Sequence, residues 1–255
     1  MSEAHLNGIT IAYEDSGDGP ALILTHGFGA AGRMWVPQRE PLNEAGYRLV
    51  SWDIRGHGGT ESPEDPRQYS EALTIADIAG LMDLLGIEKA VVGGLSLGGF
   101  MSLAFHLAHP ERVRALLLCD TGPGYRSDEG RAEWNRMAEK SAVNFEEKGL
   151  DGARRSPEVQ AVIKYHKSVA GLARSARGML AQFDSRVIDH LPSIDVPTLV
   201  IVGEHDEPFH KASQYMQSKI PGSRLETIPG AGHAANMDNP EAFNRVVLEF
   251  LASLP

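Results

Sequence analysis

Cysteine is nearly absent from the 255-residue chain, which has only Cys119, so no disulfide can form within it. Cys119 ends an apolar run, which indicates a buried strand residue rather than a reactive thiol. The first five residues contain neither a basic region nor an apolar stretch, so nothing in them predicts export. No apolar run approaches the ~18 residues needed to cross a bilayer. We therefore expect a cytoplasmic protein without a membrane span.

Positive charge is also scarce, because 24 Lys and Arg face 34 Asp and Glu, for a formal net charge of −10. This balance opposes binding to a phosphate backbone, so nucleic acid is not an expected partner. The length suits one large domain, or a domain with an insertion, that buries roughly three quarters of its unfolded surface. No metal is needed to hold such a fold, and the sequence predicts no particular oligomeric state.

Short apolar runs alternate with segments of helical spacing along most of the chain. Asn7-Gly8 predicts an N-terminal β-hairpin. Further strands are expected at residues 21–25, 47–52, 90–92, 113–119, 197–202 and 224–228, and helices at 35–44, 73–85, 99–109, 209–219 and 240–251. Repeated alternation of this kind requires a mostly parallel sheet with helices on both faces. The sequence therefore predicts the α/β class.

The alternation stops between residues 121 and 190. This stretch is mostly helix-like and holds 12 Lys or Arg against 10 Asp or Glu, whereas the rest of the chain is strongly acidic. We expect a core formed by residues 1–120 and 191–255, with residues 121–190 inserted as a helical cap, here called the cap segment.

The pentapeptide Gly94-Leu95-Ser96-Leu97-Gly98 stands between an expected strand and an expected helix. A strand, a G-x-S-x-G turn and a helix in that order form a nucleophile elbow, which exposes the serine hydroxyl above the sheet. Small residues at both ends of the motif let the strand and helix backbones approach closely. Ser96 is therefore the candidate nucleophile.

A serine hydroxyl needs a base to take its proton and an acid to orient that base. His233 stands in a glycine-rich loop after the last expected strand and is the candidate base. Asp206 follows the strand at 197–202 and is the favoured acid, because catalytic groups gather beyond the carboxyl ends of parallel strands. Asp120 ends the preceding strand and is the main rival, while Glu204 and Glu207 are local rivals.

A tetrahedral intermediate also needs donors for its negative oxygen. Two backbone amides are expected to supply them: that of Leu97, directly after the nucleophile, and that of Phe28, in the loop opened by His26-Gly27. In the cap segment, Trp134, Met137, Met179 and Phe183 are candidates for an apolar substrate pocket, with packing of the cap on the body as the alternative for each.

Together these residues resemble the α/β-hydrolase superfamily. The matching stretches are residues 21–29, 53–58, 94–99, 203–206 and 232–233, in that order, so the resemblance covers almost the whole chain outside the cap segment. Small bacterial esterases and 3-oxoadipate enol-lactonases are the most similar members, with carbon–carbon bond hydrolases and cofactor-free haloperoxidases further away. The resemblance implies a structural role for His57. Dehalogenases of the superfamily carry aspartate where Ser96 stands, which argues against their chemistry.

The resulting hypothesis is a hydrolase without metal or other cofactor that acts on a small carboxylic ester through an acyl-enzyme. The first alternative is an enol-lactonase acting on a carboxylate-bearing lactone, for which cap cations could supply the counter-charge. The candidate cations are Arg126, Arg131, Arg136, Arg154, Arg155, Arg174 and Arg177, and the alternative for them is solvated helix faces with compensating acids. A binding protein of the same fold without catalysis is the second alternative, because fold does not fix function.

Overall fold

A computed structural model describes residues 1–153 and 157–255. Within these residues one eight-stranded sheet runs in the order β1-β2-β4-β3-β5-β6-β7-β8. β1 and β2 pair antiparallel and β2 pairs antiparallel with β4, while all other pairs are parallel. The strands are β1 (Ser2–Leu6), β2 (Ile9–Ser16), β3 (Ala21–Thr25), β4 (Arg48–Trp52), β5 (Ala90–Leu95), β6 (Val113–Cys119), β7 (Thr198–Gly203) and β8 (Arg224–Ile228).

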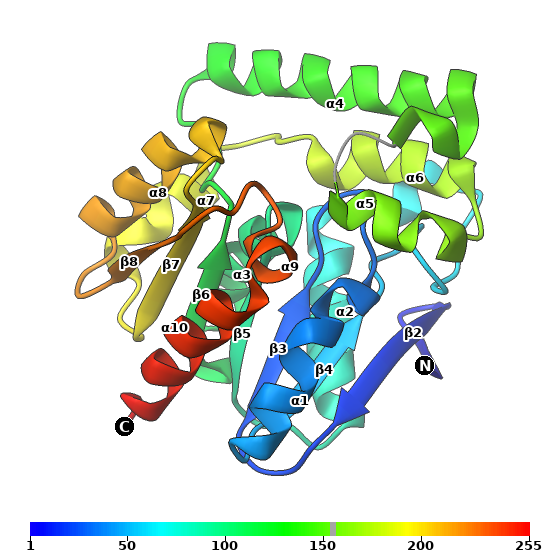
Figure 1. Ribbon diagram of the computed structural model, residues 1–255. Helices are drawn as coiled ribbons and strands as arrows, with labels where there is room; N and C mark the ends of the chain where they lie inside the picture. The colour runs from blue at the N-terminus through cyan, green and yellow to red at the C-terminus, as the bar shows by residue number, and fades with distance from the viewer. Residues whose placement is uncertain (154–156) are drawn as a thin grey trace.

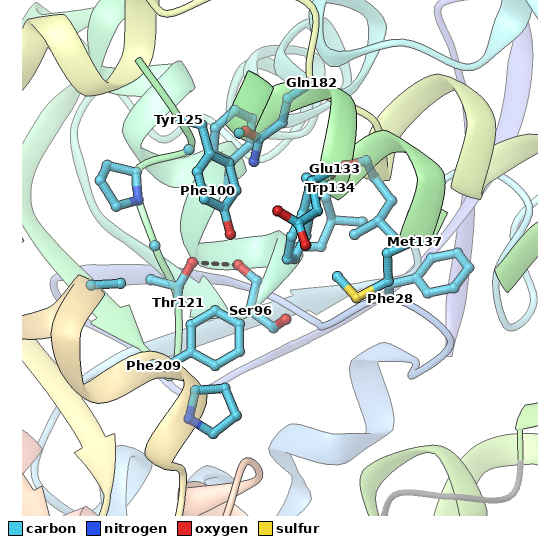
Figure 2. Close-up of a pocket in the computed structure, with 18 of the residues that line it drawn as sticks. Phe28, Ser96, Phe100, Thr121, Tyr125, Glu133, Trp134, Met137, Gln182 and Phe209 are labelled. Carbon is cyan, nitrogen blue, oxygen red and sulfur yellow. Dashed lines mark hydrogen bonds between the residues drawn. The ribbon is translucent and has the colours of Figure 1, made fainter. Parts of the chain in front are cut away.

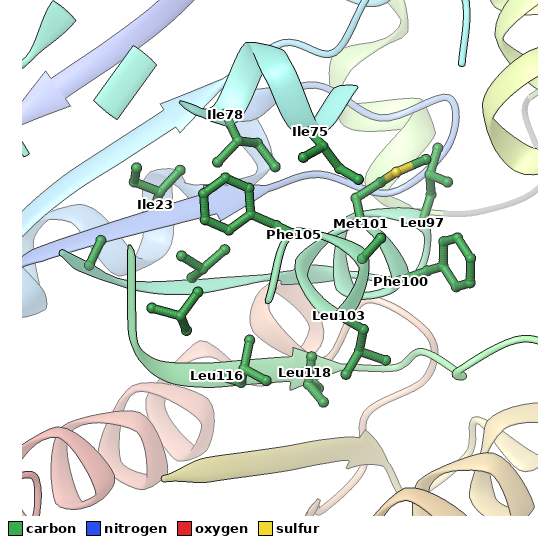
Figure 3. Close-up of a cluster of buried hydrophobic side chains, with 14 of the residues drawn as sticks. Ile23, Ile75, Ile78, Leu97, Phe100, Met101, Leu103, Phe105, Leu116 and Leu118 are labelled. Carbon is green, nitrogen blue, oxygen red and sulfur yellow. The ribbon is translucent and has the colours of Figure 1, made fainter. Parts of the chain in front are cut away.

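Helices cover both faces of this sheet (Figure 1). On one face lie α2 (Glu71–Leu84), α3 (Leu97–Ala108) and α8 (Glu207–Lys219), and on the other α1 (Val36–Glu44) and α10 (Pro240–Ala252). Side chains of β3 point alternately to the two faces of the sheet. Ile23 packs in the apolar cluster of α2 and α3 (Figure 3), whereas its neighbours Leu22 and Leu24 pack in the cluster of α1 and α10. Both faces are therefore apolar and must be covered by helices. The α/β architecture predicted from the sequence is confirmed.

Four α-helices lie in the described part of the cap segment: α4 (Asp128–Lys148), α5 (Pro157–Val162), α6 (Val169–Ser175) and α7 (Arg186–His190). Figure 1 shows α4 crossing above the carboxyl ends of the strands, with α5 and α6 beside it. Ala142 and Phe145 of α4 pack on Leu172 and Ala173 of α6, so these two helices form one small apolar cluster.

The α6 end of the cap segment is docked tightly on the body. A Cβ added to Gly56 would lie 2.6 Å from the carbonyl oxygen of Gly171 in α6, and one added to Gly178 would lie 2.1 Å from that of Tyr69. Gly178 belongs to a π-helical turn, Ala176–Leu180, that continues α6. Backbone therefore meets backbone at this joint, and a side chain at either glycine would force the two parts of the chain apart.

The remaining helical elements are short. They are α9 (Ala235–Asp238) and the 3-10 turns Gly32–Trp35, Pro66–Gln68, Pro110–Arg112, Gly149–Ala153, Ile163–Tyr165 and Leu191–Ser193. The strands β3, β6 and β8 have the bounds that the sequence predicts, and the β1–β2 turn at Asn7 and Gly8 has the two positive φ angles, 49° and 79°, of a tight hairpin. In the described part of the chain, none of the helices combines the length and the apolar character that spanning a membrane requires.

Candidate active site

Ser96 lies in the turn between β5 and α3 with φ 54° and ψ −114°, a conformation that costs a non-glycine residue roughly 1–3 kcal/mol. The glycines around it allow this turn. A Cβ added to Gly94 would lie 2.5 Å from the Thr25 carbonyl oxygen, and one added to Gly98 would lie 2.1 Å from the same atom. The turn is held on its far side by the Ser96 amide, which donates to the Cys119 carbonyl at 2.9 Å.

His233 and Asp206 meet in the loops after β8 and β7. Nδ1 of His233 lies 2.8 Å from Oδ2 of Asp206, whose side chain is almost fully buried. Burial pulls the pKa of His233 down, but the hydrogen bond to Asp206 and the charge of its carboxylate outweigh burial, so this pKa is raised above 6.5. Ser96 and His233 line the same cavity. Ser96, Asp206 and His233 thus all lie at the edge of the sheet where the parallel strands have their carboxyl ends.

Asp120, the main rival acid, has a different set of partners. Its Oδ1 accepts from the Gly203 amide at 2.7 Å and its Oδ2 from the Ala235 amide at 3.4 Å, so it joins the loops that carry Asp206 and His233. Burial raises the pKa of this fully buried carboxyl well above its ordinary value. Of the local rivals, Glu204 accepts from the Gly230 amide at 2.7 Å, and Glu207 is the first residue of α8.

The two residues expected to donate from the backbone both line the cavity. Leu97 is the first residue of α3, where amides lack a partner within the helix and the helix dipole favours negative charge. Phe28 is the second residue of a tight turn closed by the Ala30 amide, which donates to the Gly27 carbonyl at 3.1 Å. The Phe28 ring meets the Phe145 ring of α4 edge-on, with centroids 5.8 Å apart.

The cavity above Ser96 has a volume of about 870 Å³ and lies between α4 and the strand ends. Figure 2 shows Trp134 and Met137 of α4 beside it, as the sequence suggested, and Trp134 Nε1 is fixed by donating to the Leu180 carbonyl at 2.7 Å. Of the other lining residues that carry a side chain, most are apolar or aromatic, namely Phe28, Leu97, Phe100, Pro123, Tyr125, Leu180, Pro208, Phe209 and Ala212. The cavity is thus suited to an apolar group next to the serine.

The pocket assignments of Met179 and Phe183 are wrong. Met179 is 1% exposed and belongs to the core, where its sulfur accepts from Thr74 Oγ1 at 3.1 Å. Phe183 is 72% exposed and lies outside the cavity lining. Met179 lies within the π-helical turn Ala176–Leu180, and Phe183 lies in the non-helical stretch that follows it.

Several lining residues were not singled out from the sequence. Tyr125 and Glu133 reach the cavity from the start of the cap segment, and Thr121 donates through Oγ1 to the Ser96 carbonyl at 2.6 Å (Figure 2). Phe209 follows Asp206 by three residues, and its ring stacks on that of His233. Its place in the first turn of a helix that opens at the catalytic edge is a signal that could have found it.

Most of the cap cations have partners. Arg126 pairs with Asp189, Arg131 with Asp128, and Arg177 with Glu139 and Glu146. Arg174 donates to the Pro63 carbonyl at 3.1 Å, and Arg154 and Arg155 lie outside the described residues. Arg136 and Lys140 differ, because they line the cavity and have no hydrogen-bond or ion-pair partner among the residues that the structure describes.

His57 is fully buried in the loop after β4 and is engaged through both ring nitrogens. Nε2 accepts from the Gly29 amide at 3.1 Å and Nδ1 donates to the Arg55 carbonyl at 3.1 Å. Burial holds the pKa of His57 well below its ordinary value, so the ring is neutral. Its only basic nitrogen is occupied, as a structural residue requires.

Over residues 1–153 and 157–255, no cluster of three or more His, Cys, Asp or Glu side chains has the arrangement of a metal site.

Comparison with known proteins gives a consistent family. A model of the alpha/beta hydrolase family matches residues 22–246. A Bacillus subtilis (strain 168) protein with the provisional name 2-succinyl-6-hydroxy-2,4-cyclohexadiene-1-carboxylate synthase is 31% identical over 267 residues that cover 97% of each chain.

Two solved structures are similar over nearly the whole length. A thermophilic esterase from Thermogutta terrifontis has a TM-score of 0.85 at 30% identity, with 99% of this chain and 98% of the other covered. The enol-lactonase from Burkholderia xenovorans LB400 has a TM-score of 0.83 at 28% identity, with 99% and 100% covered.

Proposed function

The chain belongs to the alpha/beta hydrolase family, and from that membership we propose that it is a serine hydrolase that cleaves carboxylic esters through an acyl-enzyme. The observation that carries this proposal is the shared cavity of Ser96 and His233, with Asp206 bound to Nδ1 of the histidine. Similarity to a thermophilic esterase over nearly the whole chain agrees with it.

In the proposed reaction Ser96 Oγ attacks the ester carbonyl while Nε2 of His233 takes its proton. Asp206 holds the proton on Nδ1, which leaves Nε2 free as the base and stabilises the imidazolium that forms. The Phe28 and Leu97 amides donate to the oxyanion, each contributing roughly 3–4 kcal/mol. His233 returns its proton to the leaving alcohol, and water then releases the acid by the same steps. The scheme uses no metal or other cofactor.

The cap segment is proposed to select the substrate. Apolar side chains dominate the cavity wall, so an apolar acyl or alcohol group fits the space beside Ser96.

Replacing the nucleophile tests the proposal. Ser96→Ala should lose at least about 10³-fold in kcat on p-nitrophenyl esters of graded acyl length, and wild type but not the variant should be labelled by a fluorophosphonate. Ser102→Ala is the matched control, because Ser102 is buried in α3 and donates to the Gly98 carbonyl at 2.8 Å away from the cavity. Near-wild-type hydrolysis by Ser96→Ala would rule the proposal out. An unlabelled wild type that binds small molecules without turnover would support a binding protein instead.

A carboxylate-bearing enol-lactone is the second candidate substrate, favoured by Arg136 and Lys140, which line the cavity and have no ion-pair partner within residues 1–153 and 157–255. The similarity to an enol-lactonase agrees with it. The double variant Arg136→Gln/Lys140→Gln should raise KM about 10-fold or more for a carboxylated lactone and leave neutral esters unchanged. Arg126→Gln is the control, because Arg126 pairs with Asp189 outside the cavity. Equal effects on charged and neutral substrates would remove this candidate.

A further inference from the structure

His166 connects the cap segment to two loops of the body. Its Nδ1 lies 2.9 Å from the Gly58 amide nitrogen and its Nε2 lies 2.8 Å from the Gly29 carbonyl oxygen. An amide can only donate and a carbonyl can only accept, so both contacts together require the neutral tautomer with the proton on Nε2. Burial lowers the pKa of His166 and favours this neutral form.

Gly29 is held from its other side by His57, whose Nε2 accepts from the Gly29 amide at 3.1 Å. His57 has the opposite tautomer, because its Nδ1 donates to the Arg55 carbonyl. The rings of His57 and His166 meet edge-on with centroids 5.9 Å apart. Both polar backbone groups of Gly29 are therefore occupied by imidazoles, one from the body and one from the cap segment.

Gly29 is also the third residue of the turn that presents the Phe28 amide. Its φ of 76° is typical of a type II turn, which differs from type I in the orientation of the central peptide, here Phe28–Gly29. Rotation of the Phe28–Gly29 peptide would change the orientation of the preceding peptide, Gly27–Phe28, which carries the Phe28 N–H. The hydrogen bond from the Gly29 N–H to His57 opposes such a rotation. His166 holds the next peptide through the Gly29 carbonyl, and the N–H of that peptide, from Ala30, donates to the Gly27 carbonyl at 3.1 Å. The Gly27 carbonyl belongs to the peptide that carries the Phe28 N–H, so both histidines help the turn to keep one orientation.

We propose that His166 is a positioning residue for ester cleavage: by donating to the Gly29 carbonyl, it keeps the Phe28 amide directed at the oxyanion. The oxyanion hole is therefore complete only when the cap segment is docked on the body through His166. This inference rests on the proposed function of Ser96 and Phe28. His166 itself lies outside the cavity lining, so its proposed role is to position the Phe28 amide rather than to contact the substrate.

Two isosteric substitutions separate the contacts of His166. A glutamine amide nitrogen reaches the place of Nε2, whereas an asparagine side chain reaches only that of Nδ1. His166→Gln therefore keeps the bond to Gly29, and His166→Asn keeps only the contact with Gly58. We expect His166→Asn to lose about 10- to 100-fold in kcat on p-nitrophenyl acetate with KM within about twofold, and His166→Gln to remain within about threefold of wild type.

Lys167→Met is the matched control for cap docking. Lys167 is the next residue, and its Nζ donates to the Gly59 carbonyl at 2.6 Å, so the variant removes a neighbouring bond between cap and body without changing Gly29. Wild-type kcat is expected. Thermal unfolding and circular dichroism of the three variants establish that each is folded before its kinetics are compared.

Affinity for an alkyl boronic acid gives a second readout, because its adduct with Ser96 places a negative oxygen in the oxyanion hole. This affinity should fall in His166→Asn by about the same factor as kcat. Wild-type kcat in His166→Asn, equal losses in His166→Asn and His166→Gln, or unchanged boronic acid affinity would overturn the inference while wild type still cleaves esters. A wild type that cleaves no ester would overturn the proposed function, and this inference with it.

Discussion

The phenyl ring of Phe209 stacks on the imidazole of His233, with centroids 4.9 Å and ring planes 29° apart. Phe209 and Asp206 come from the same loop and helix start, so one short segment supplies both the carboxylate for Nδ1 and an apolar cover for the ring. The imidazole is thereby fixed along an edge and over a face, which leaves the Nε2 side for the serine.

Removing this aromatic cover should weaken catalysis moderately. Phe209→Leu should lower kcat/KM on short esters about 3- to 10-fold, because an aromatic pair contributes roughly 0.5–1.5 kcal/mol beyond its buried area. Phe209→Tyr keeps the ring and serves as the control. An unchanged kcat/KM in Phe209→Leu would show that the stacking does not position the base.

Removing the charge of Asp206 should have a far larger effect. Asp206→Asn should lower kcat about 10³- to 10⁴-fold, since the amide cannot hold the required tautomer. The pH profile should change as well. His233 must be neutral to act as a base, so wild-type activity is lost as pH falls through its raised pKa, and this limb should move to lower pH in the variant. A limb that stays in place would contradict the role of Asp206.

For Asp120, the rival acid, substitution should affect the stability of the fold more than catalysis. Asp120→Asn should lower the free energy of unfolding by about 1–3 kcal/mol, because an amide group cannot accept from both the Gly203 and Ala235 amides. Its kcat should stay within about tenfold of wild type. Denaturant titration and ester kinetics on the same samples measure both effects, and a larger loss in kcat than that of Asp206→Asn would exchange the two roles.

A pH-dependent stability is expected from His26, which is fully buried. Its Nδ1 donates to the Gly27 carbonyl and its Nε2 accepts from the Ile54 amide, and burial lowers its pKa from 6.5 to about 3. As pH falls below 6.5 only the unfolded chain gains this proton, so stability is lost. The advantage of wild type over His26→Gln should shrink by about 2 kcal/mol between about pH 7.5 and pH 5. Urea unfolding at both pH values measures this difference, and a constant gap would contradict it.

The core of the fold was predictable because its signals are local. The apolar run at β3 and the glycines at 94 and 98 each reflect a constraint that neighbouring residues impose, and the structure agrees with the strand and the turn that they predict. Met179 and Phe183 were misplaced because an apolar residue type alone does not distinguish a pocket wall from the core or the surface. Met179 packs in the core from a π-helical turn, and Phe183 is exposed in the non-helical stretch that follows.

The choice between Asp206 and Asp120 shows a second limit of the sequence. Both acids follow parallel strands, so the chain order alone leaves two candidates, and they differ in the direction of their side chains. Asp206 meets His233, whereas the Asp120 carboxyl faces the amides of Gly203 and Ala235. The hydrogen bonds of His57 and His166 with Gly29 could not be predicted from the sequence for a similar reason, because His166 lies 137 residues from Gly29 along the chain.

The α6 end and the α4 end of the cap segment differ in how freely their sequences can change. At the α6 end, Gly56 packs against the backbone of Gly171, and Gly178 packs against that of Tyr69. Any side chain at that joint would disturb packing, so its sequence has little freedom. Glu133, Arg136 and Lys140 lie on α4 with exposed side chains that border the cavity. A mutant library restricted to such α4 positions would therefore vary substrate preference while leaving both the joint and the serine turn intact.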